Sequence, residues 1–216
     1  TTAIVDLNLE AAAKVAAEVE KETGVKTIGV QANVLEKESL QKAKEIINRE
    51  LGKIDIMING AGGNSPKATT QVEKMENIGL NDLEKTFFGL QTDAFDFVMN
   101  LNLKGTILPT MVFATDLVEK GKGNILNISS MNSFRPLTKI PAYSAAKGAV
   151  NNFTQWLAVH MAKTGVRVNA IAPGFFLTNQ NRFLLTDEKT GELTARGKKI
   201  IANTPVEKFG EPEHLV

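Results

Sequence analysis

The chain has 216 residues, a length that suits one medium-sized or large domain. Its 25 basic and 24 acidic residues give a formal net charge of +1, so the positive surplus that nucleic-acid-binding proteins usually carry is absent. It contains no cysteine, which excludes disulfides, thiolate zinc sites and cysteine nucleophiles.

Two further exclusions follow from the residue pattern. His160 and His214 are the only histidines and have no ligand-like spacing, so we expect no metal site. No apolar run approaches the about 18 residues of a membrane span, and the first residues show no signal-peptide core. Together with the lack of cysteine, this favours a cytoplasmic protein that binds neither membrane nor nucleic acid.

Short apolar runs alternate with longer amphipathic stretches along the chain. We predict strands at 3–5, 27–30, 54–58, 124–128 and 166–172. We predict helices at 9–23, 37–51, 93–119, 142–164 and 193–203, the first two stopped by glycines. A polar stretch from Asn64 to about Thr92 interrupts this alternation, and connections of that length are usually functional or disordered.

The repeated strand–helix order predicts an α/β fold in which a doubly wound parallel sheet has helices on both faces, in three αβα layers. We expect residues 1–216 to form a single domain. Ligands of such sheets bind beyond the carboxyl ends of the strands. The segments that directly follow a predicted strand are Asp6, 59–63, 129–130 and 173–174.

Tyr143 is the only tyrosine, and Lys147 follows it by four residues in a predicted helix. That spacing places both side chains on one helix face. An adjacent ammonium favours the phenolate, which predicts a lowered pKa for Tyr143 and a role in proton exchange with an alcohol or carbonyl oxygen. Ser130, at the end of the preceding strand, could hydrogen-bond the same oxygen. The plainer interpretations are a surface Tyr–Lys pair and a serine that caps the strand end.

Several segments together resemble the short-chain dehydrogenase/reductase family, in the family's order and spacing. They are Asn59-Gly60-Ala61-Gly62, Asn102 before Gly105, Asn127-Ile128-Ser129-Ser130, Tyr143-Ser144-Ala145-Ala146-Lys147 and Arg167-Val168-Asn169-Ala170-Ile171-Ala172-Pro173-Gly174. The resemblance covers nearly the whole chain and implies a Rossmann-type fold and a nicotinamide cofactor.

The resemblance implies a role for each matching residue. Tyr143 would be the catalytic acid/base, and Ser130 would orient the substrate carbonyl. Lys147 would lower the pKa of Tyr143 and hold the nicotinamide ribose, and Asn102 would hold a water that relays protons to Lys147. The further cofactor contacts would come from Asn33, Val34, Asn59, Ala61, Gly62, Pro173, Gly174 and Thr178. Without the resemblance, the glycines after Asn59 could form only a tight turn, and Asn102 could only cross-link a helix to a strand.

Asp6 bears on the choice of cofactor. An acid at the end of an early strand can accept hydrogen bonds from the adenosine ribose and repels a 2′-phosphate. Leu7 and Asn8 follow it, without an adjacent arginine, which favours NAD over NADP. Asp6 could instead cap the following helix, although Asn8 is better placed to do so.

The chain departs from the family at three places. The glycine-rich phosphate loop has no match, and the chain begins at what resembles the family's second strand and ends before its last. We therefore expect the native protein to be longer at both ends, because the absent first strand would leave its two neighbours without ladder partners. The other departures are Asn33, where the family often has aspartate, and Gly60, where it usually has asparagine.

Within the family, two segments resemble the D-mannonate oxidoreductases (fructuronate reductases), which implies interconversion of D-fructuronate and D-mannonate. The first comprises Phe87-Phe88-Gly89-Leu90, Phe97-Val98, Leu101-Asn102 and Gly105-Thr106, and the second is Met131-Asn132-Ser133-Phe134-Arg135-Pro136. A sugar acid needs a cation for its carboxylate. Arg135 is the first candidate and Arg182 the second, with Lys139 in the same loop as Arg135, although each could be an ordinary surface cation. Asn132, Asn179 and Gln180 could bind hydroxyls.

Two alternatives remain open. Gluconate 5-dehydrogenase, or another polyol or 3-oxoacyl reductase of the family, is the enzymatic rival, and a non-catalytic nucleotide-binding redox sensor is the rival from another class.

Apolar residues on more than one face of the two long helices, among them Phe113, Phe153 and Trp156, predict burial against a partner. The resemblance also implies a homodimer or homotetramer.

Overall fold

The computed structural model describes residues 1–178 and 181–215. The chain divides into two compact units, Thr1–Ala172 and Pro173–Val216, and each is described by itself.

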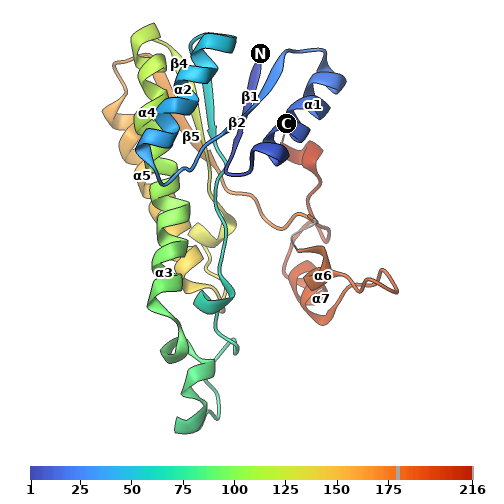
Figure 1. Cartoon of the computed structure of the whole chain (residues 1–216). Coiled ribbons are helices and arrows are strands. Elements are labelled where there is room, and N and C mark those ends of the chain that lie inside the picture. The colour runs from blue at the N-terminus through green and yellow to red at the C-terminus, as the bar shows by residue number, and fades with distance from the viewer. Residues whose placement is uncertain (179–180, 216) are drawn as a thin grey trace. The chain divides into compact units, whose positions relative to one another are not determined.

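Five parallel strands form the framework of the first unit (Figure 1). They are β1 (Thr2–Asp6), β2 (Thr27–Gln31), β3 (Ile56–Asn59), β4 (Gly123–Ile128) and β5 (Val166–Ile171). β1 pairs with β2, and β4 lies between β3 and β5. Among the described residues no ladder joins β1 to β3, so the strands form a two-stranded and a three-stranded sheet.

The first unit has five α-helices, four of which lie beside the strands. They are α1 (Leu9–Thr23), α2 (Lys37–Leu51), α3 (Thr92–Met99), α4 (Gly105–Lys120) and α5 (Pro141–His160). Figure 1 shows α1 beside β1 and β2 on one side and α2, α4 and α5 on the other. The prediction of an α/β fold with a parallel sheet in three layers is confirmed.

Local residue chemistry sets the helix boundaries. The Asn8 side chain accepts a hydrogen bond from the backbone N–H of Ala11 at 3.1 Å and thereby caps α1, as predicted. Gly24 ends the helix in the left-handed conformation, with φ 68°, which glycine adopts without a steric penalty. Pro141 begins α5, where a missing N–H costs nothing.

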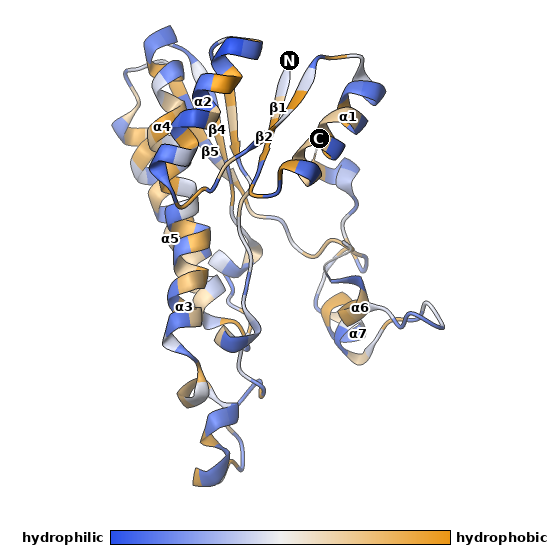
Figure 2. Ribbon diagram, in the orientation of Figure 1, coloured by the Kyte–Doolittle hydropathy of each residue, from blue (hydrophilic) through white to orange (hydrophobic). Residues whose placement is uncertain are grey.

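The core lies on the side of the sheets that α2, α4 and α5 cover. Val30, Met57 and Phe113 belong to one buried cluster, and Ile125 and Leu157 belong to another. Hydrophobic residues line these strands and helices in Figure 2. On β3, however, burial alternates, and Ile56 and Ile58 are exposed. The predicted helix cover on both faces of the sheet therefore does not extend to β3, because no described helix covers its second face.

The helix predicted at 93–119 is not continuous. Helix α3 passes into a π-helical turn, Asn100–Lys104, and only then into α4. Such π-turns occur frequently at functional sites. Pro109, inside α4, lacks the N–H that would bond to the carbonyl of Gly105. The apolar periodicity of this segment continues through the turn and therefore does not reveal it.

The polar stretch between β3 and α3 is folded. It contains three 3₁₀ helices, η1 (Pro66–Ala68), η2 (Leu80–Lys85) and η3 (Phe87–Gly89). The backbone N–H of Gln71 bonds to the carbonyl of Lys85 at 2.9 Å, so the stretch closes on itself. We refer to residues 64–91 as the insertion; Figure 1 shows it beyond the strands, next to α3.

The second unit contains α6 (Arg182–Leu185) and α7 (Ala195–Ala202). Helix α7 lies within the predicted range 193–203, whereas α6 was not predicted. Single bridges join Phe176 to Gly210 and Thr186 to Leu193. None of the described helices is long and apolar enough to cross a membrane.

Candidate active site

Tyr143 and Lys147 lie one turn apart on α5, and Lys147 is only 4% exposed. Its Nζ lies 5.6 Å from the centre of the Tyr143 ring and donates a 2.7 Å hydrogen bond to the carbonyl of Ile128, the last residue of β4. Ser130 follows two residues later, and its side chain lies close enough to that of Tyr143 to lower the pKa of the phenol. The structure thus brings together the three side chains that the sequence singled out.

The electrostatics differ from the prediction. Burial raises the pKa of Tyr143 above its ordinary value, and the nearby Ser130 side chain offsets this only in part. Burial also lowers the pKa of Lys147 to about 8. The predicted lowering of the pKa of Tyr143 is therefore wrong, because desolvation of the phenol by burial is the larger effect.

Asn102 is fully buried in the π-turn and fastens the loop that follows β3. Its Nδ2 donates to the carbonyls of Gly63 at 2.7 Å and Val98 at 2.8 Å, and its Oδ1 accepts from the N–H of Gly63 at 3.2 Å. A Cβ at Gly62 would lie 2.7 Å from that Oδ1 and 3.3 Å from Lys147 Nζ. A glycine is therefore required where this loop passes between Asn102 and Lys147.

The Asn59 side chain is part of a buried polar ladder. Its Nδ2 donates to Thr110 Oγ1 on α4 at 2.9 Å and to Asn127 Oδ1 on β4 at 2.8 Å. Asn127 in turn donates to Thr154 on α5 at 2.8 Å. The predicted cofactor contact of Asn59 would therefore involve its backbone, because its side chain joins β3 and β4 to the helices. The sequence analysis missed this role of Asn127, although both asparagines occupy inward strand positions.

The residues predicted for the adenosine end lie at the carboxyl ends of β1 and β2. Asp6 is exposed, and its Oδ1 accepts from the N–H of Asn8 at 2.8 Å. The side chain of Asn33 is held by Glu36 and Leu35, and Val34 packs against Gly105.

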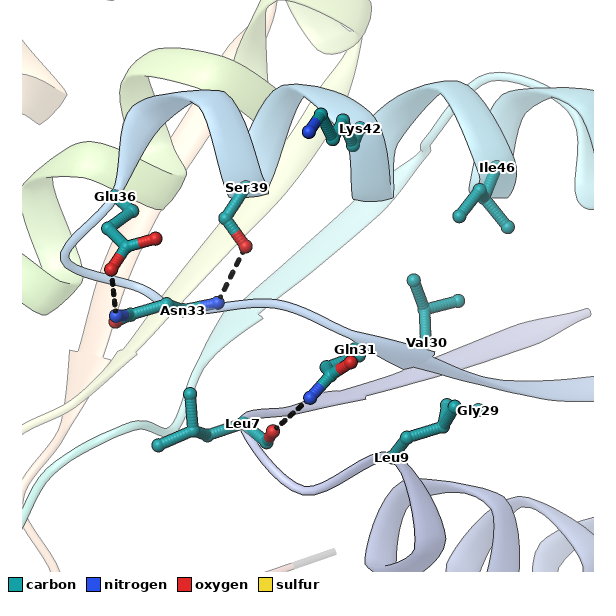
Figure 3. A pocket seen from close by; sticks show the side chains of 10 residues that line it. All are labelled: Leu7, Leu9, Gly29, Val30, Gln31, Asn33, Glu36, Ser39, Lys42 and Ile46. Atoms are coloured by element: carbon teal, nitrogen blue, oxygen red, sulfur yellow. Dashed lines mark hydrogen bonds between the residues drawn. The ribbon is translucent and has the colours of Figure 1, made fainter.

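A cavity of about 550 Å³ borders this end, between α1 and α2 (Figure 3). Its lining comprises Leu7, Leu9, Gly29, Val30, Gln31, Asn33, Glu36, Ser39, Lys42 and Ile46. Tyr143 and Ser130 do not line it, so it lies apart from the candidate catalytic side chains.

The remaining candidate residues, predicted to bind the substrate or the nicotinamide end of the cofactor, fall into two groups. In the loop between β4 and α5, Asn132 is buried and Arg135 is exposed. Pro173, Gly174, Thr178 and Arg182 belong to the second unit, where Arg182 begins α6. Asn179 and Gln180 lie outside the described residues. The roles of all these residues stay predictions.

The insertion contributes to the site in a way that the sequence analysis missed. Ala68 is fully buried in a cluster with Ala94, Val98 and Ala142, and Tyr143 packs against this cluster. The backbone N–H of Thr70 donates at 2.9 Å to the carbonyl of Lys139, in the loop that leads to α5. No sequence motif marks this contact, because it joins segments about 70 residues apart.

Comparison with known proteins identifies the family. The sequence profile described as short chain dehydrogenase matches residues 1–189. The chain belongs to this family. An uncharacterized oxidoreductase of Haemophilus influenzae is 53% identical over 214 residues, covering 99% of this chain and 74% of that protein. The uncharacterized oxidoreductase UxuB of Bacillus subtilis is 49% identical over 187 residues, covering 87% of this short-chain dehydrogenase and 66% of that protein.

Solved structures of other short-chain dehydrogenases share the fold. A crystal structure from Haemophilus influenzae, provisionally named a D-mannonate oxidoreductase and holding NAD, is 52% identical, with a TM-score of 0.90 over 99% of this chain and 75% of that one. A gluconate 5-dehydrogenase from Burkholderia cenocepacia, solved with NADP and tartrate, is 27% identical, with a TM-score of 0.77 over 96% of this chain and 72% of that one.

Proposed function

We propose that this short-chain dehydrogenase uses NAD to interconvert D-fructuronate and D-mannonate. The observation that carries the proposal is the meeting of Ser130, Tyr143 and Lys147 at the carboxyl end of β4. The similarity to a structure provisionally named a D-mannonate oxidoreductase supports the choice of substrate. In the reductive direction the carbonyl carbon receives a hydride and the carbonyl oxygen a proton.

The protein's own residues would handle the proton and the orientation of the substrate. Tyr143 donates its phenolic proton to the oxygen of the substrate as the hydride arrives, because its raised pKa keeps it protonated before the reaction. The Ser130 hydroxyl holds the same oxygen. Lys147 lies beside the ring and stabilises the phenolate that forms.

The residues present fit a nicotinamide cofactor. Asp6 is exposed at the end of β1, and only one of its oxygens has a described partner, so the other can accept from a ribose hydroxyl. An added Cβ at Gly60 would meet no atom within 4 Å, so the loop after β3 leaves open space there. Lys147 would hold the nicotinamide ribose, and the bound cofactor would supply or accept the hydride. The carboxylate of Asp6 disfavours a 2′-phosphate, which supports NAD.

Two residues of the loop after β4 suit a sugar acid. Arg135 is exposed five residues after Ser130 and offers a guanidinium for the carboxylate. Asn132 Oδ1 is buried without a hydrogen-bond partner. A buried acceptor left unsatisfied costs about 1–3 kcal/mol. A ligand hydroxyl that reached this oxygen when the loop shifts would remove that cost.

Turnover of matched substrates by the purified full-length protein tests the proposal. We expect reduction of D-fructuronate with NADH to exceed reduction with NADPH, and Tyr143→Phe to abolish turnover while NADH binding persists. Arg135→Leu should raise KM for the acid. Arg135→Lys, which keeps the positive charge, should raise KM less. The gluconate 5-dehydrogenase alternative is considered because the chain is 29% identical to an Escherichia coli 5-keto-D-gluconate 5-reductase. Reduction of 5-keto-D-gluconate but not of fructuronate would favour that alternative. Full activity of Tyr143→Phe would refute the mechanism.

We also propose that a second copy of the chain covers the outer face of α4 and α5. Met111, Trp156 and Val159 are exposed on these helices. Phe153 and Trp156 stack with ring centres 6.2 Å apart, which fixes an apolar surface on α5. Phe113, predicted to meet a partner, is instead buried in the core of its own chain.

A further inference from the structure

We propose that Asn151 is a positioning residue that holds Ser130 in place through Ser133. The inference rests on the proposed function, because it concerns the hydroxyl that would hold the substrate oxygen. Asn151 lies on α5, eight residues after Tyr143, and matches none of the motifs that identify the site.

A chain of two hydrogen bonds leads from α5 to Ser130. Asn151 Nδ2 donates to Ser133 Oγ at 2.7 Å, and Ser133 Oγ donates to the backbone carbonyl of Ser130 at 2.6 Å. A serine hydroxyl can donate only one hydrogen bond, and the Ser133 hydroxyl donates it to the backbone carbonyl of Ser130. Ser133 must therefore accept from its other neighbour, which fixes the amide nitrogen of Asn151 as the donor.

The segment that carries Ser130 needs such an anchor. It leads into a three-residue 3₁₀ turn, η5 (Met131–Ser133). Within it, the N–H of Ser133 bonds to the Ser130 carbonyl at 3.0 Å, and the N–H of Asn132 bonds to Ser130 Oγ at 3.2 Å. A single 3₁₀ turn has poor hydrogen-bond geometry and does not persist without tertiary support. The contact with Asn151 supplies support at the turn's last residue.

The position of Asn151 explains why this anchor bears on catalysis. Tyr143, Lys147 and Asn151 are spaced four residues apart on one continuous helix. A helix of this kind behaves as a rigid unit, so a link from it to Ser130 sets the distance between the two hydroxyls that would flank the substrate oxygen. Losing the link would let Ser130 drift relative to Tyr143 while leaving the cofactor contacts intact. Misplacement by about 1 Å can cost as much as about a hundredfold in rate.

The experiment compares four variants of the full-length enzyme with a rescue variant, using whichever carbonyl substrate the wild type reduces. Asn151→Asp keeps the shape but can only accept, so it would draw the Ser133 proton away from Ser130. Asn151→Leu and Ser133→Ala remove the link. Asn152→Leu is the matched control, because Asn152 is the exposed neighbouring asparagine on the same helix. Ser133→Thr, which keeps the hydroxyl, serves as the rescue.

We expect Asn151→Asp, Asn151→Leu and Ser133→Ala each to lower kcat by about ten- to a hundredfold, with NADH affinity unchanged. Asn152→Leu and Ser133→Thr should retain kcat within about twofold, and combining Ser133→Ala with Asn151→Leu should cost no more than either alone. Wild-type kcat in Asn151→Asp and Ser133→Ala, with only a lowered melting temperature, would overturn the proposal. Failure of the fructuronate assignment would appear separately, as a wild type inactive on that substrate.

Discussion

Lys147 combines a buried position with a charge that the proposed mechanism needs. Its pKa falls from 10.5 to about 8 because burial disfavours the ammonium. A shift of this size corresponds to a penalty of about 3 kcal/mol on the charged form. Above the unfolded-state pKa of 10.5, the lysine is neutral in both states and carries no charge penalty. As the pH falls from 10.5 to the folded-state pKa of about 8, the unfolded state binds the proton first and the folded state loses stability. At neutral pH the residue therefore destabilises the fold in which it acts.

Replacing Lys147 by methionine should separate stability from activity. At pH 7 we expect Lys147→Met to raise the unfolding free energy by about 2 kcal/mol, because removal of the charge penalty outweighs the lost bond to the Ile128 carbonyl, which contributes about 1 kcal/mol. Turnover should be lost. Urea unfolding between pH 6 and 10.5 measures the difference, which should shrink as the pH rises. Equal stability of the two proteins at pH 7 would show that the lysine is not desolvated.

At the scale of elements, the insertion lies against the helix that carries Tyr143. Ala68 of η1 is fully buried in the cluster against which Tyr143 packs. A larger side chain at this position has no room and must displace α3 or the first turn of α5.

We expect Ala68→Leu to lower kcat by at least about tenfold, because the Tyr143 ring shifts from its productive position. Ala43→Leu is the matched control, since Ala43 is equally buried on α2, in the cluster that contains Met57 and Phe113. Both variants should lose about 1–3 kcal/mol of stability. If both lose the same fraction of kcat at a temperature where they stay folded, the insertion has no specific role at Tyr143.

A second contact between elements joins α2 to α4. The Lys44 ammonium lies 2.6 Å from a carboxylate oxygen of Asp116, which is 2% exposed. Burial acts to raise the pKa of Asp116, but hydrogen bonds from Lys44, the N–H of Ile54 and Asn48 together hold it below its usual value. A depressed aspartate pKa gives stability that is present above the unfolded pKa of about 3.9 and is lost as the pH falls through the folded value.

Asp116→Ala should therefore destabilise the protein in a pH-dependent way. At pH 7 we expect a loss of about 3 kcal/mol, because Lys44 loses its partner and the N–H of Ile54 its acceptor. The gap to the wild type should narrow below about pH 4, where the carboxyl group of Asp116 begins to bind a proton in the unfolded state while it stays ionised in the folded state. Thermal unfolding at pH 7 and pH 3 tests this. A constant gap at both values would mean that the carboxylate is not the stabilising species.

At the scale of the whole molecule, the exposed apolar face of α4 and α5 sets the expected assembly. Trp156 is 56% and Val159 79% exposed, which is costly unless another surface covers them. Trp156→Glu would place a charge at the centre of the proposed contact. We expect light scattering to show a dimer or tetramer for the wild type and a lower mass for this variant, whereas Gln155→Glu, at an exposed position on the same helix, should assemble normally. A monomeric wild type would contradict the proposal.

Local chemistry determined much of what the sequence revealed. Asn8 and Gly24 fixed both ends of α1, and helices predicted at 9–23 and 37–51 match the observed bounds. The four-residue spacing of Tyr143 and Lys147 places them on one face of α5, whatever packs around that helix. These features depend on neighbours within a few residues, so one sequence suffices to predict them.

Long-range contacts decided the rest. The packing of Ala68 near Tyr143, the ladder through Asn59 and Asn127, and the link from Asn151 to Ser133 join segments that are distant in sequence. Burial also reversed the expected direction of the Tyr143 pKa, because desolvation depends on everything packed around the phenol. The sequence by itself determined which groups carry the chemistry and on which elements they lie. Only the tertiary structure decided how they are held and charged, because packing and desolvation arise from residues that no local pattern connects.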